Sequence, residues 1–157
     1  MKVECFPWQA WWPEYRQGFL FFEKPENIST TKEYITNSIW EMINKTELVV
    51  CFIDKNAWEW LGNSGLHNIQ TNSPEIWIRL KAWVHGKWYA QEWLIALINW
   101  AKDNLDYDYI IYPVDENNLP SRKLAEKLWG QLQGWVTAMR VPNSSRILNI
   151  VNYRIYK

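Results

Sequence analysis

Apolar and polar residues alternate along this chain with two periods, and each period predicts a different element. Residues 75–81 alternate strictly, with Ile76, Ile78 and Leu80 apolar, which predicts a strand with one buried face. Between residues 87 and 104 the apolar side chains recur every three or four positions, which predicts a helix with one apolar stripe. The chain therefore has the pattern of a protein that mixes helices with a sheet.

The same periods, with the turn residues between them, assign the rest of the chain. Strands are predicted at residues 2–8, 48–53, 58–69, 75–81, 109–114, 131–139 and 146–156, and helices at 13–22, 30–45, 87–104 and 118–128. The helix at 30–45 is predicted to open with a capping box, because Glu33 follows Thr30 at the required spacing. No repeat, low-complexity tract or long linker divides the chain, so residues 1–157 are expected to form a single domain.

Charge and hydropathy narrow the function classes. The 17 Lys and Arg residues balance 17 Asp and Glu residues, which argues against a disordered tail and against a strongly basic nucleic-acid-binding protein. No apolar run reaches the roughly 18 residues of a membrane helix. Glu4 and Pro7 also interrupt the apolar stretch that a signal peptide needs, so a cytoplasmic protein with no membrane partner is expected.

The residue types that bind metals or act as nucleophiles are sparse. Cys5 and Cys51 do not form a Cys-x-x-Cys pair and are expected to be reduced and buried. His67 and His85 are the only histidines, and their spacing matches no metal-ligand set, so no metal is expected. The chain also lacks the glycine motifs of phosphate-binding and dinucleotide-binding loops.

Tryptophan is the residue with an abnormal frequency. The chain has 13 Trp but only 6 Gly, whereas an ordinary glycine content of roughly 7% would give about 11. Many large rings and few glycines in one chain suggest that rings occupy positions that small residues hold elsewhere.

Several short motifs occur in order on the predicted elements. They are Pro74-Glu75-Ile76, Val84-His85-Gly86-Lys87, Gln91-Glu92, Asn118-Leu119-Pro120-Ser121 and Glu126-Lys127-Leu128. In this order and spacing, residues 28–157 resemble the GCN5-related N-acetyltransferase (GNAT) superfamily, closest to its ribosomal-protein N-acetyltransferase-like branch. The resemblance implies an α/β fold, of the α+β kind: a mixed, mostly antiparallel twisted sheet with helices on both faces and a central splay. It also implies a shortened N-terminal part, because relatives place a longer strand and helix pair before residue 26.

The resemblance implies acyl transfer from acetyl-CoA to an amine. The cofactor would lie between the strands at 75–81 and 109–114, with its pyrophosphate on the backbone where the long helix begins. The implied cofactor-binding residues are Val84, His85, Gly86, Lys87, Trp88, Tyr89, Ala90, Asn118 and Ser121. An asparagine before a proline-containing first turn, as at Asn118, is more often only a helix cap. The resemblance implies that Glu75 is the catalytic base. The alternative, a solvated glutamate at a strand edge without a catalytic role, fits the sequence as well. Ala125 stands where many members carry a tyrosine that protonates the leaving thiolate.

The departures from the family pattern involve tryptophan. Trp58, Trp88 and Trp129 stand at positions where relatives commonly have glycine, and Trp93 stands where they often have alanine. An indole at position 88 would crowd the phosphate loop, so acetyl-CoA binding is expected to be weak or absent and the activity weakened or lost.

Three classes of function remain open from the sequence. The chain is either an acetyl-CoA-dependent enzyme with an unusual loop, a non-catalytic binding protein, or a protein whose rings form an oligomer interface. In the second class, the rings of Trp77, Trp83, Trp88, Trp93 and Trp129 would line one aromatic groove for an apolar aromatic ligand or a peptide. In the third, Trp8, Trp11 and Trp12 would form a contact patch for a homo-oligomer. Several such replacements in one groove also suggest a redesigned protein.

Overall fold

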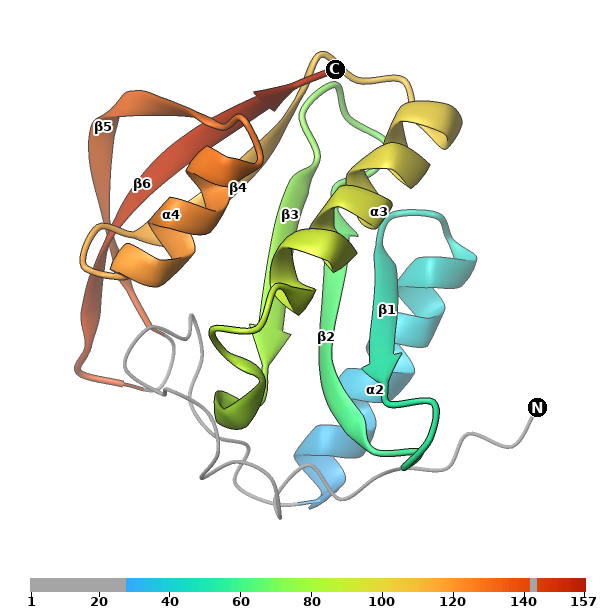
Figure 1. Ribbon diagram of the computed structural model, residues 1–157. Coiled ribbons are helices and arrows are strands. Elements are labelled where there is room, and N and C mark those ends of the chain that lie inside the picture. Colours follow the sequence, from blue (N-terminus) through green and yellow to red (C-terminus); the bar gives the residue numbers. More distant parts are fainter. Residues whose placement is uncertain (1–27, 142–143) are drawn as a thin grey trace.

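One six-stranded sheet with helices on both faces forms the protein in the computed structural model, which describes residues 28–141 and 144–157 (Figure 1). The strands follow the order β1-β2-β3-β4-β6-β5 and are β1 (Leu48–Ile53), β2 (Trp60–His67), β3 (Glu75–Leu80), β4 (Tyr109–Asp115), β5 (Gln131–Arg140) and β6 (Ile147–Tyr156). The helices are α2 (Ile28–Ile43), α3 (Tyr89–Asn104) and α4 (Leu119–Lys127), and a 3-10 turn, η3 (Ala82–Val84), precedes α3. The mixed, mostly antiparallel sheet confirms the predicted fold class. The strand and helix predicted at residues 2–8 and 13–22 lie outside the described residues.

Three predicted element starts are wrong. Helix α2 begins at Ile28, so Thr30 lies inside the helix and the predicted capping box does not start it. Helix α3 begins at Tyr89 instead of residue 87, because η3 and a short loop turn the chain first and Trp88 is the N-cap. Strand β2 begins at Trp60 instead of residue 58, because Trp58 has a left-handed backbone with φ of 53°.

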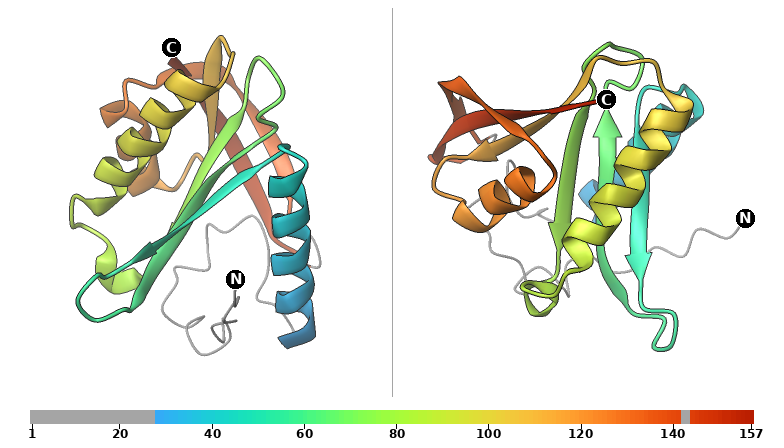
Figure 2. Two further views of the ribbon diagram at one scale, coloured as in Figure 1. Left: turned by 90° about the vertical axis from the view of Figure 1, so that its right-hand side faces the viewer. Right: turned by 45° about the horizontal axis from the view of Figure 1, so that its top comes forward.

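The helices divide between the two faces of the sheet. Helices α3 and α4 cover one face and α2 covers the other (Figure 2). Alternation along β3 directs Ile76 toward α3, where it joins a core with Leu94 and Leu97. Within the described ranges, no helix is long and apolar enough to cross a membrane.

Strands β3 and β4 touch only where they begin. They run parallel, and α3 is the crossover that connects them. Their one register pair is Glu75 with Ile111, supported by a hydrogen bond of 2.8 Å from the Ile111 N–H to the Pro74 carbonyl. Beyond this pair the strands separate in a V, which is visible between β3 and β4 in Figure 1. The predicted splay is therefore confirmed.

Candidate functional site

The V between β3 and β4 opens into a cavity of about 740 Å³ on the face covered by α3 and α4. Its walls come from the second half of β3, the loop before α3, the middle of β4 and the first turns of α4. Of the predicted cofactor-binding residues, the cavity is lined by Val84, His85, Gly86, Lys87, Trp88, Ala90, Asn118 and Ser121. Tyr89 does not line it and stacks on Trp93, with ring centroids 5.5 Å apart. The structure thus brings all but one of these residues together around one cavity, between the loop before α3 and the start of α4.

The loop before α3 presents backbone donors to this cavity. Within the described part of the chain, the N–H groups of residues 86–90 have no hydrogen-bond partner. Gly86 has φ of 76°, and a Cβ added to it would meet nothing within 4 Å. The side-chain oxygen of Gln91, which lines the same cavity, is buried without a partner. Free N–H groups at a helix N-terminus attract anions, so the loop has the properties that a phosphate group requires.

The charges around the cavity have one sign. The side chains of Lys87, Lys123 and Lys127 line it, and His85 adds a fourth basic side chain. Among the described residues that line it there is no carboxylate. A cavity whose charged side chains are all basic, and which also presents free N–H groups, favours a polyanion over a neutral or cationic ligand.

Trp88 lies at the mouth of the cavity instead of filling it. Its backbone has φ of −49°, which is right-handed and needs no glycine, and 74% of the residue is exposed. The ammonium group of Lys127, in the last turn of α4, lies 4.6 Å from the centroid of the indole. The ring and the lysine therefore connect the loop before α3 with the end of α4 at the edge of the cavity.

Tyr112 is the functional candidate that sequence reasoning missed. It is buried in the cavity wall on β4, and its hydroxyl shares a hydrogen bond of 2.8 Å with the hydroxyl of Ser121 on α4. Burial raises the pKa of Tyr112 to about 12, so the phenol stays protonated at neutral pH. The signal was the alternation of Ile110, Tyr112 and Val114, which directs all three side chains to the buried face of β4 toward the helices.

Asn118 and Glu75 occupy positions that fit both of their predicted roles. The side-chain oxygen of Asn118 accepts the Ser121 N–H at 3.3 Å, so Asn118 caps α4 while it also lines the cavity. Glu75 does not line the described cavity. It sits at the vertex of the V, in the β3–β4 register pair, and alternation with Ile76 directs its side chain to the opposite face of the sheet.

The prediction that five indoles line one groove is wrong, because only Trp88 lines the cavity. Trp93 stacks on Phe52 with ring centroids 3.9 Å apart, over β1. Trp83 lies under the ammonium group of Lys87, 4.9 Å from it. Trp129 lines a separate pocket of about 220 Å³ between α3 and β6. Alternation of strand faces and the length of α3 separate these rings, and neither effect is visible in their spacing along the chain.

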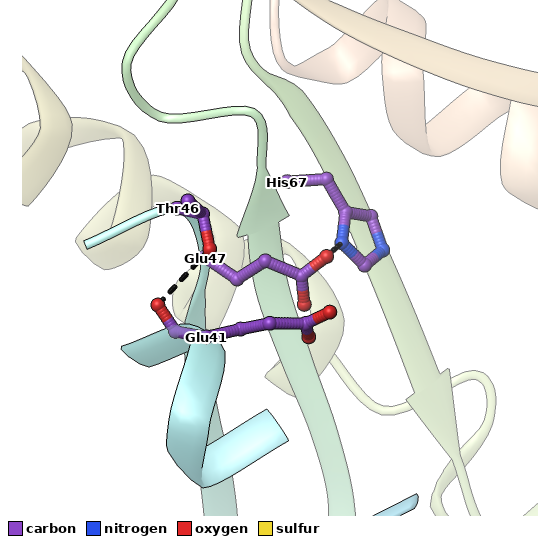
Figure 3. A network of polar contacts seen from close by, with 4 residues as sticks. All are labelled: Glu41, Thr46, Glu47 and His67. Carbon is purple, nitrogen blue, oxygen red and sulfur yellow. Dashed lines mark hydrogen bonds and ion pairs between the residues drawn. The ribbon is translucent and has the colours of Figure 1, made fainter. Parts of the chain in front are cut away.

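Trp77, the fifth ring, belongs to the opposite face of the sheet. It stacks on His67, with ring centroids 5.6 Å apart. His67 Nδ1 also pairs with Glu47, and Figure 3 shows the carboxyl group of Glu41 directed toward the same place. Burial, and then the nearby Glu47, raise the pKa of Glu41. No group of three potential metal-ligating side chains occurs among the described residues, at this network or elsewhere.

Comparisons with known proteins agree with this architecture. The family described as "Acetyltransferase (GNAT) domain" matches residues 7–129. A ribosomal-protein-S5-alanine acetyltransferase from Vibrio fischeri has a TM-score of 0.78 at 13% identity, over 94% of this chain and 85% of that chain. A spermidine N-acetyltransferase from Vibrio cholerae, in complex with CoA and spermine, has a TM-score of 0.74 at 17% identity, over 89% and 81%. A ribosomal L7/L12 α-N-protein acetyltransferase in complex with coenzyme A has a TM-score of 0.75 at 16% identity, over 94% and 81%. No curated protein matches the chain.

Proposed function

Because the chain belongs to the GNAT acetyltransferase family, we propose that it transfers an acetyl group from acetyl-CoA to an amine and binds the cofactor in the cavity between β3 and β4. The observation that carries this proposal is the chemistry of the cavity wall. Basic side chains and the free N–H groups of residues 86–90 surround a space with no carboxylate among its described lining residues. That combination suits a ligand with several phosphates.

Each part of the cofactor has a matching part of the wall. The N–H groups of residues 86–90 would hold the pyrophosphate, and Lys87, Lys123 and Lys127 would neutralise its charge and that of the remaining phosphate. Asn118 and the buried side-chain oxygen of Gln91 would pair with the amide groups of the pantetheine.

Acetyl-CoA supplies the thioester carbon that an amine attacks. Glu75, on the far side of the sheet at the vertex of the V, accepts the proton that the amine loses. On the cavity side, the Ser121 hydroxyl donates a hydrogen bond toward the leaving sulfur, and the protonated Tyr112 donates to Ser121 in turn. This pair replaces the tyrosine that many family members carry at the position of Ala125, which has no hydroxyl group to protonate the leaving thiolate.

Trp88 weakens cofactor binding in this proposal. Its ring holds the Lys127 ammonium group at 4.6 Å from the centroid, so a phosphate has to compete for that cation and pass the indole at the mouth. An exposed cation–π contact contributes about 0.5–1 kcal/mol, which corresponds to a several-fold loss of affinity. The second candidate, an aromatic-ligand site, has no comparable support because the five rings lie apart.

Isothermal titration of the whole chain with acetyl-CoA tests the proposal. We expect saturable binding that Lys123→Gln weakens and that Trp88→Gly strengthens about three- to tenfold. Trp135→Gly is the matched control, because Trp135 is also exposed but lies on β5 and does not line the cavity. If neither the unchanged chain nor Trp88→Gly bound acetyl-CoA, the proposed function would be wrong. Saturable binding of a planar aromatic compound instead would favour the second candidate.

A further inference from the structure

Two tryptophans have a backbone conformation that favours glycine. The φ angles of Trp58 and Trp129 are 53° and 59°, in the left-handed region. A residue with a Cβ enters this region at a cost of roughly tenfold in the folding equilibrium, whereas glycine enters it freely. Lys45 and Asn68 are also left-handed, with φ of 58° and 56°. Asparagine is of a type that tolerates the region, whereas a bulky ring such as tryptophan is rare there.

The hydrogen bonds around Trp129 define a glycine position. The Trp129 N–H donates to the Glu126 carbonyl at 3.0 Å, and the Gly130 N–H donates to the Ala125 carbonyl at 2.9 Å. These two bonds form a Schellman motif at the end of α4, with Trp129 as its left-handed residue. Glycine is the usual residue at that point because it has no Cβ to oppose the conformation.

Trp58 completes the turn between β1 and β2. The Asp54 carboxylate accepts the N–H groups of Asn56 and Ala57, both at 2.8 Å, and the Asp54 N–H donates to the Glu59 carbonyl at 2.8 Å. The chain reverses inside this closed turn, and Trp58, two residues before β2 begins, holds a left-handed conformation that glycine adopts without strain.

Packing does not explain either ring. Trp58 is 76% exposed and Trp129 is 77% exposed, so both indoles bury little surface. At both positions, therefore, little buried surface offsets the cost of the left-handed backbone.

We infer that positions 58 and 129 are glycine positions of this protein, and that its gene specifies them with UGA. Some genetic codes read this codon as tryptophan and others read it as glycine. Glycine at these two positions would lower the tryptophan count from 13 and raise the glycine count from 6, so both counts would move toward ordinary usage. The inference goes beyond the proposed function, since it follows from backbone angles and hydrogen bonds that lie outside the cavity.

The codons of the gene provide the direct test. We expect UGA at positions 58 and 129, glycine in the corresponding peptides of the protein isolated from its own cell, and UGG at Trp40 and Trp100. The last two lie inside α2 and α3, where glycine would weaken the helix. UGG codons at positions 58 and 129, or tryptophan in those peptides, would overturn the inference. The two tryptophans would then be genuine residues of the protein, introduced by design or by selection.

Thermal unfolding tests the backbone argument separately. Trp58→Gly and Trp129→Gly are each expected to raise the Tm by about 2–4 °C. Trp58→Ala and Trp129→Ala are the matched controls, since alanine removes the ring but keeps the Cβ that opposes the left-handed backbone. Equal gains from alanine and glycine would attribute the effect to the ring and would contradict the glycine assignment.

Discussion

Trp88 and Trp129 both stand at the end of a helix, Trp88 before α3 and Trp129 after α4, but the two indoles differ in backbone and surroundings. Trp88 has a right-handed backbone and lies at the mouth of the cavity, beside Lys127. Trp129 has a left-handed backbone and lies outside that cavity, at the end of α4. The first ring therefore affects what binds, and the second affects how readily the chain folds.

The difference shows that a glycine can be required for either of two physical reasons. At position 88 the requirement concerns space for a ligand, because the backbone itself accepts any residue there. At position 129 it concerns the backbone angle, which opposes every residue with a Cβ. A sequence pattern reports both as the same missing glycine.

The largest expected effect sharpens the functional side of this comparison. Glu75→Gln is expected to lower kcat by at least about 100-fold, because a general base contributes 10²–10⁴-fold, while the Kd for acetyl-CoA stays unchanged. Measurements in a Trp88→Gly background keep the cofactor bound at practical concentrations. A loss of less than about threefold would show that Glu75 is only a strand-edge residue.

The next effect tests whether ligand space matters at position 88 alone. Trp88→Gly is expected to lower the Kd for acetyl-CoA by about three- to tenfold, and Trp129→Gly is expected to leave it unchanged. The double variant should bind like Trp88→Gly, because the two sites share no contact that would couple them. An equal gain of affinity from Trp129→Gly would remove the distinction between the two rings.

The same pair of variants should give the reverse order in stability. Trp129→Gly is expected to stabilise the fold by about 1 kcal/mol, through release of the left-handed strain, and to raise the Tm by about 2–4 °C. Trp88→Gly should leave the Tm within about 1 °C, because residue 88 is an N-cap, where glycine is well tolerated. Calorimetry that found the larger gain for Trp88→Gly would contradict the comparison.

The smallest effect concerns the opposite face of the sheet, where Glu41 lies near Glu47 (Figure 3). Because the folded-state pKa of Glu41 is raised, its contribution to stability is complete at acid pH and is lost as the pH rises through that pKa. Glu41→Gln mimics the protonated form, so it should raise the Tm by about 1–2 °C at pH 7 and by nothing below about pH 4. Glu33→Gln, on the exposed side of α2, is the control for removal of one charge. A gain that was equal at both pH values would argue against a proton-linked cause.

Local patterns were sufficient for most of the fold. Alternation in β3 and the apolar stripe of α3 predicted both elements within two residues of their observed bounds. The helix between β3 and β4 predicted their parallel pairing, and the resemblance to the GNAT superfamily implied the splay. The capping box predicted at Thr30 was wrong, because a spacing between only two residues, Thr30 and Glu33, is a weak signal. Helix α2 already includes Ile28, so Thr30 lies inside it.

The sequence by itself determined which residues form the loop before α3, because residues 84–88 are neighbours along the chain and turn together into that helix. Only the tertiary structure decided how the five tryptophans are distributed, since faces of a sheet and sides of a helix separate rings that a pattern groups together. It also revealed Tyr112, whose partner Ser121 lies on a different element. Contacts across elements depend on how strands and helices pack, and no local period records that packing.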